Sequence, residues 1–157
     1  MLTRGELLKT GAGGAMLLAL GGCAAPADRS TTLRAIAAAI LDGALPSAGP
    51  ARDAALSRAV EGVHIAISGL PPAVQDEVSQ LFGLLDFPLT RRFVAGVGPW
   101  DRASIPEVAA FLERWRTSGV TLFRSGYQAL HQLVYAGWYG ANDTWAAIGY
   151  PGPPRIA

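Results

Sequence analysis

The sequence predicts an all-α protein, a single bundle of about five helices, on three observations. Apolar residues recur at spacings of three and four in five segments, which is the periodicity of a helix with one buried face. No segment shows the alternating pattern of a half-buried strand, and no internal repeat occurs. With 157 residues, 50% hydrophobic and 16% charged, the chain has the length of one domain and is too apolar to be disordered.

The first three helices are predicted over residues 33–41, 52–68 and 74–85. A hydroxyl residue among Ser30, Thr31 and Thr32 is placed to cap the first of them. Pro88 ends the third, because proline neither continues a helix nor donates a backbone hydrogen bond. The expected apolar stripes are Leu33, Ile36, Ala37, Ile40 and Leu41; Leu56, Val60, Val63 and Ile67; and Val74, Val78, Leu81, Phe82 and Leu85.

The next part of the chain is predicted to form a short helical segment and a fourth helix. The short segment spans Phe87 to Val94, and the glycines of Gly96-Val97-Gly98-Pro99 break it. Ser104 and Glu107 then form a capping box at the start of the fourth helix, with Pro106 in its first turn. The stripe of this helix is Val108, Phe111, Leu112 and Trp115.

The last long helix is predicted from Val120 to Tyr139, after a break at Gly119. Asn142 or Asp143 is placed to cap one further turn. The tail from Trp145 to Pro154 is rich in proline, glycine and aromatic residues, and it is expected to be nonhelical. It packs either on its own domain or on a partner. The apolar candidates of the helix are Leu122, Phe123, Leu130, Val134 and Trp138.

Residues 1–22 have the layout of a bacterial export signal. Arg4 and Lys9 supply a basic head, and Gly11 to Gly22 follow as twelve uncharged residues. Twelve helical residues span about 18 Å at 1.5 Å each. This is well short of the roughly 30 Å hydrocarbon core of a bilayer. We therefore expect a signal segment and not a permanent transmembrane helix.

The only cysteine, Cys23, directly follows this segment. Leu20-Gly21-Gly22-Cys23 resembles the lipobox of a bacterial lipoprotein, in which diacylglycerol is attached to the cysteine and the cysteine becomes the new amino terminus. Two or more acyl chains hold a protein stably on a membrane. The alternative is a cysteine that merely neighbours an ordinary cleavage site. The preferred prediction is lipidation of Cys23, a tether over residues 23–32 and a helical domain over residues 33–157.

The signal segment also resembles the twin-arginine export motif. Thr3-Arg4 and Leu7-Leu8-Lys9 fit its register, but Gly5 stands where the second arginine is expected. General secretion, or export beside a partner with a complete signal, therefore remains open. Removal of residues 1–22 takes away two of the 13 basic and one of the 12 acidic residues, which leaves 11 of each. This balance leaves no general field that would recruit nucleic acid.

The chain lacks the residue sets on which common enzymes and metal sites depend. Neither His64 nor His131 has a histidine or cysteine at i+3 or i+4, so helical metal ligation has no second ligand. No nucleophile elbow, P-loop or dinucleotide-binding loop occurs. We expect no catalytic, cofactor-binding or metal-binding residue in this chain, and we expect both histidines to be ordinary surface or hydrogen-bonded residues.

Arginine and the large aromatic residues concentrate in the second half of the chain. All four tryptophans and all four tyrosines lie there, and Trp, Tyr and Arg are enriched in binding hot spots. Core burial, with arginine stems covering apolar surface, accounts for some of them. The rings of Tyr135-Ala136-Gly137-Trp138-Tyr139 point in more directions than one buried face covers. The candidate partner-binding residues are Arg91, Arg92, Trp100, Trp115, Tyr135, Trp138, Tyr139, Trp145, Tyr150 and Pro151.

The second half resembles the small (gamma) subunit of bacterial membrane-bound flavin dehydrogenases, the gluconate 2-dehydrogenase subunit 3 family. Members carry an aromatic helix that ends near a tryptophan, and then a Gly-Tyr-Pro-Gly-Pro tail. The resemblance covers about residues 90–154. The matching residues are Tyr135, Tyr139, Trp145, Gly149, Tyr150, Pro151, Gly152 and Pro153.

This resemblance implies a noncatalytic role in an oxidoreductase complex. A large subunit of the glucose-methanol-choline type holds FAD and oxidises a sugar, a sugar acid or an alcohol, and a multihaem cytochrome c often takes the electrons. The small subunit supports maturation and export of the large one. We therefore expect an export chaperone in the periplasm, anchored to the membrane through Cys23 and without a cofactor of its own.

Two other functions are compatible with the residues. The first is a free-standing lipoprotein that binds a small apolar ligand among its helices. The second is a small hydrolase, which would need His64 or His131 within hydrogen-bond reach of a nucleophile in a cleft.

Overall fold

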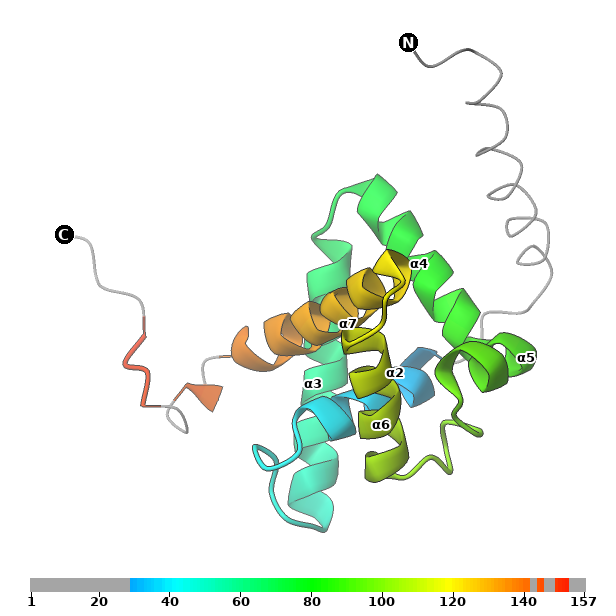
Figure 1. Cartoon of the computed structure of the whole chain (residues 1–157). Coiled ribbons are helices and arrows are strands. Elements are labelled where there is room, and N and C mark those ends of the chain that lie inside the picture. The colour runs from blue at the N-terminus through cyan, green and yellow to red at the C-terminus, as the bar shows by residue number, and fades with distance from the viewer. Residues whose placement is uncertain (1–28, 142–143, 146–148, 153–157) are drawn as a thin grey trace, which may run out of the picture.

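The structure, a computed structural model, describes residues 29–141, 144–145 and 149–152. Over these ranges it contains helices and no strand, as the sequence predicted, and Figure 1 shows the helices packed as one irregular bundle. The five long helices are α2 (Arg29–Ile40), α3 (Pro50–Ser68), α4 (Pro72–Asp86), α6 (Ile105–Arg116) and α7 (Thr121–Tyr139).

A short helical segment connects α4 to α6, close to where it was predicted. It consists of α5 (Pro88–Thr90) and a π-helical turn, η1 (Arg91–Ala95). Gly96 ends the turn with φ 64°, a left-handed conformation that glycine adopts without steric cost. Within the described ranges, no helix is both long and apolar enough to cross a membrane.

Most of the predicted stripe residues face the interior. Within the described ranges, the buried apolar residues run from Leu33 to Trp138. The predictions for Val74 and Leu122 were wrong, because both side chains are exposed. Val74 lies in the first turn of α4, at the end of the bundle. Leu122 is one residue from Phe123, which turns inward to stack on Trp115 at 5.3 Å between ring centroids.

The first helix begins earlier than predicted. α2 starts at Arg29, so Thr32 lies inside the helix and the predicted cap among residues 30–32 was wrong. Thr32 is buried, and its hydroxyl donates a hydrogen bond to the carboxylate of Asp86 at the end of α4. Arg29 Nη2 lies 2.6 Å from Ser79 Oγ. These contacts join α2 to α4.

The predicted capping box is present at the start of α6. The Glu107 carboxylate accepts hydrogen bonds from the Ser104 backbone N–H at 2.8 Å and from the Ser104 hydroxyl at 2.7 Å. These bonds favour the charged carboxylate and lower the pKa of Glu107 below its ordinary value. The predicted cap at Asn142 or Asp143 lies outside the described residues.

Two glycines set the distance between α3 and α7. A Cβ added to Gly62 would lie 2.8 Å from Gly137 Cα. A Cβ added to Gly137 would lie 2.5 Å from the Val63 backbone nitrogen and 2.8 Å from the Ala59 carbonyl oxygen. No real Cβ tolerates such separations, so the two backbones touch directly where the helices pack. This close approach positions α7 in the bundle.

The substitution Gly62→Ala tests this packing. We expect it to lower the free energy of unfolding by about 1–3 kcal/mol, the usual cost of overpacking, because α3 and α7 must move apart. Urea unfolding measures the change.

The matched control is Gly83→Ala in α4, where an added Cβ has nothing within 4 Å. It should raise the free energy of unfolding by about 0.5–1 kcal/mol, because alanine loses less backbone entropy than glycine in a helix. Equal free energies of unfolding for the two variants would show that α3 and α7 do not pack closely at Gly62.

Candidate functional site

A row of four aromatic side chains runs along α7, and we call it the α7 aromatic row. Its members are four residues apart, so they lie one above another on the helix. The ring centroids are separated by 5.4 Å, then 4.2 Å, then 5.6 Å, with tilted or edge-to-face geometry. The members are Tyr127, His131, Tyr135 and Tyr139.

The buried face of α7 lies next to this row. Leu130, Val134 and Gly137 are buried, and α7 packs mainly on α3. Because this packing fixes the rotation of the helix, the aromatic row lies along the edge of the buried face. Tyr127 and Tyr139 are half-buried against the core, whereas Tyr135 is 40% exposed.

The C-terminal segment continues the aromatic surface beyond α7. Thr144 is buried, and its hydroxyl lies 2.8 and 2.9 Å from two carbonyl oxygens at the end of the helix. Trp145 Nε1 donates a hydrogen bond to the Tyr139 carbonyl at 2.7 Å. The Trp145 ring then meets Tyr150 edge-to-face at 5.2 Å, and we call these two residues the tail pair. Gly152 lies so near that an added Cβ would be 3.3 Å from the Trp145 ring.

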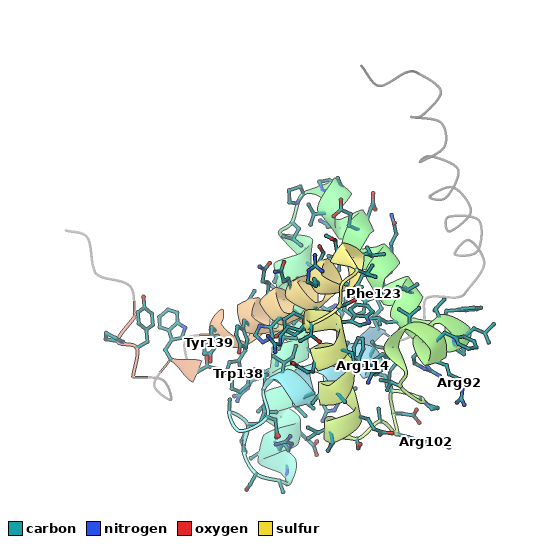
Figure 2. All side chains as sticks on the ribbon, in the orientation of Figure 1. Arg92, Arg102, Arg114, Phe123, Trp138 and Tyr139 are labelled. Atoms are coloured by element: carbon teal, nitrogen blue, oxygen red, sulfur yellow. The ribbon has the colours of Figure 1, made fainter. Side chains whose placement is uncertain are left out.

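Together, the row and the tail pair form a surface suited to binding another protein. Tyr150 is 45% exposed, and Figure 2 shows Tyr139 at the end of α7 from which the chain continues to the tail pair. Tyr and Trp give large contact areas at low entropic cost, and here their rings are already packed on one another. Such preorganisation reduces the cost of association.

The structure places the ten predicted partner-binding residues in three environments. Arg92, Tyr135, Tyr150 and Pro151 are exposed; Arg91, Tyr139 and Trp145 are half-buried; Trp100, Trp115 and Trp138 are buried.

Two of the buried tryptophans, Trp100 and Trp115, join α6 and the loop before it to α4 and η1. Trp100 Nε1 donates to the Leu85 carbonyl at 3.0 Å, and Trp115 Nε1 donates to the Val94 carbonyl at 3.2 Å. Trp115 also packs so closely on α7 that a Cβ on Gly126 would lie 2.5 Å from its ring. In this conformation these rings stabilise the fold and offer no surface to a partner.

Some arginines of the second half bond within the fold, whereas one projects into solvent. Arg116 makes a two-bonded ion pair with Glu113 at 2.7 and 2.8 Å, and Arg114 donates to the Ala95 carbonyl. Arg124 donates to the Ser118 carbonyl at 2.6 Å. Arg92, by contrast, has no hydrogen-bond or ion-pair partner in the described part of the chain, and Figure 2 shows it projecting from the bundle.

His131 lies between Tyr127 and Tyr135 in the aromatic row, a role that the sequence analysis missed. The spacing of residues 127, 131 and 135 is visible in the sequence, but it signals neither metal binding nor catalysis, the two roles considered for this histidine. Partial burial lowers the pKa of His131 below its ordinary value of 6.5, because desolvation disfavours the charged imidazolium. The row therefore carries a neutral ring at neutral pH.

Two shallow hollows were found on the surface. One, of about 280 Å³, is lined by Thr31, Thr32, Asp86, Arg91, Pro99, Trp100 and Asp101. The other, of about 190 Å³, includes His64 with Ser57 and Glu61. Both open to solvent, and neither is the enclosed apolar cavity that a ligand held among the helices would need. Over the described residues, no group of three or more His, Cys, Asp or Glu side chains could hold a metal ion.

Comparison with known proteins finds no protein-family model, no curated protein and no solved structure that matches the chain. The functional interpretation therefore depends on the residues and their arrangement.

We expect the stability of the protein to depend on His131 in mildly acidic solution. Its pKa is lower in the folded state than in the unfolded state, so the unfolded state binds the proton more readily. The neutral ring makes its full contribution to the free energy of unfolding above pH 6.5. This contribution is lost as the pH falls from 6.5 toward the folded-state pKa. Chemical unfolding of the wild-type chain across this range measures the loss.

The variant His131→Phe is the control, because it keeps a ring between the two tyrosines and cannot titrate. Its stability should rise relative to the wild type as the pH falls below 6.5. Parallel stability curves for the two proteins would contradict the assignment.

Proposed function

We propose that this protein is a noncatalytic accessory subunit of an exported, FAD-dependent dehydrogenase complex of the glucose-methanol-choline type. In that complex it supports the maturation and export of the large flavoprotein subunit. The observation that carries the proposal is the α7 aromatic row with the tail pair, a prepacked and partly exposed aromatic surface at one end of the bundle.

The family resemblance falls on the same part of the chain as this surface. Tyr135 and Tyr139 belong to the row, and Trp145 and Tyr150 form the tail pair. The Gly-Tyr-Pro-Gly segment of the resemblance is the segment that brings Tyr150 and Gly152 against Trp145. The residues on which the resemblance rests thus lie close together at the end of α7, and this supports a docking role for them.

The proposed complex divides its tasks between chains. The large subunit binds FAD and oxidises a sugar, a sugar acid or an alcohol, and a multihaem cytochrome c receives the electrons. This chain supplies the aromatic surface, on which Tyr135 and Tyr150 act as anchors that lose solvent contact when the flavoprotein binds. Its export signal carries the complex out of the cytoplasm, and the lipid on Cys23 retains it at the periplasmic side of the membrane.

Coexpression with a large flavoprotein subunit of the glucose-methanol-choline type tests the proposal. The large subunit should be exported and active in its presence, and retained and inactive in its absence. Export of an active large subunit without this chain would overturn the proposal.

The double variant Tyr135→Ser, Tyr150→Ser should weaken binding of the large subunit by about tenfold or more, because both rings are expected to be hot spots. Copurification and titration of the two purified subunits measure the effect.

The matched control is Val74→Ser on α4, since Val74 is 38% exposed and Tyr135 is 40% exposed. It should leave the affinity unchanged. Equal losses from the control and the double variant would show that the aromatic surface is not where the flavoprotein docks.

A further inference from the structure

The segment α5–η1 exposes apolar side chains beside Arg92, which has no partner among the described residues. Phe93 is 81% exposed, the largest value among the large apolar residues of the described chain, and Leu89 is 61% exposed. Arg92 lies next to Phe93, and residues 89, 92 and 93 share one helical face. We call Phe87, Leu89, Arg92 and Phe93 the α5–η1 patch. Residues 87–100 contain two arginines and no acidic residue, so the chain here is locally basic.

The inner side of this segment is firmly attached to the bundle. Trp115 Nε1 bonds to the Val94 carbonyl at 3.2 Å, and Arg114 bonds to the Ala95 carbonyl. The Thr90 hydroxyl lies 3.0 Å from the Phe87 carbonyl oxygen. The patch is therefore presented on a fixed backbone, in a π-helical turn, a geometry often found at functional sites.

The patch lies beside the point where the chain arrives from Cys23. Thr32, in the first part of α2, bonds to Asp86, and Phe87 is the next residue. Cys23 is six residues before Arg29, and six residues span at most about 20 Å. A lipid on Cys23 would thus hold this end of the bundle within about 20 Å of the bilayer surface.

We propose that the α5–η1 patch is a second membrane contact, which rests on the lipid anchor of the proposed function. Phe87, Leu89 and Phe93 enter the boundary between headgroups and acyl chains, and Arg92 binds the phosphates of anionic lipids. The acyl chains on Cys23 hold the protein at the membrane through a tether, and a second contact on the domain itself fixes the orientation of the protein at the bilayer. Figure 1 shows α5 and the C-terminal end of α7 on opposite sides of the bundle, so the aromatic surface stays free for the flavoprotein.

Vesicle sedimentation tests this contact without any partner protein. The probe is the mature chain from residue 23 with Cys23→Ser, which keeps the whole core and carries no acyl group. It should bind vesicles of phosphatidylcholine and phosphatidylglycerol, and bind phosphatidylcholine alone more weakly.

Leu89→Ser with Phe93→Ser should lower the partition coefficient by about tenfold or more. Arg92→Gln should lower the partition coefficient about fivefold, and only with the anionic vesicles.

Ile65→Ser is the matched control, because Ile65 is 64% exposed but lies on α3. The 15 residues of α4, about 22 Å of helix, separate that end of α3 from α5. This variant should bind vesicles as the parent does. Circular dichroism confirms that each variant is folded.

The proposal is overturned if the parent does not bind anionic vesicles, or if Leu89→Ser with Phe93→Ser binds as well as the parent. It is also overturned if the Ile65 control loses as much binding as the patch variant. Because no flavoprotein is present, failure of the coexpression experiment would leave these vesicle results intact. The two proposals therefore fail separately.

Discussion

The direct contact between the backbones of α3 and α7 at Gly62 and Gly137 is the constraint on which the rest of the bundle depends. It fixes how α7 is rotated, with Leu130 and Val134 inside. The aromatic row then lies along the edge of this buried face, where Tyr135 is exposed and the other three rings are half-buried. A side chain at either glycine would change the position of α7 and, with it, the candidate docking surface.

Aromatic residues have two separate tasks in this protein. Trp100 and Trp115 are buried, and their ring N–H groups bond to main-chain carbonyls of the segments before α6. The tyrosines of α7 stack along the helix and keep part of their surface in solvent. The first group fixes the position of α5–η1, and the second provides the aromatic surface. The two surfaces thus share one scaffold, and α5 and the C-terminal end of α7 lie on opposite sides of it (Figure 1).

Local sequence signals predicted most of the secondary structure. The spacing of apolar residues located the long helices, and Ser104 with Glu107 located the start of α6 to the residue. Proline and glycine marked the ends of α4 and η1. These signals work because periodicity, capping and backbone restriction act within a few residues of the chain. The start of α2 was missed because a long-range contact holds it. The Thr32 hydroxyl bonds to Asp86, 54 residues away in the chain.

The sequence by itself determined that this is a helical protein with an aromatic, arginine-containing second half. Only the tertiary structure decided which of these side chains are available. Trp138 and Tyr135 lie three residues apart on α7, yet one is buried and the other is exposed, because helix rotation is set by contacts with α3. Composition names the residue types that bind partners, whereas exposure follows from packing between segments distant in the chain.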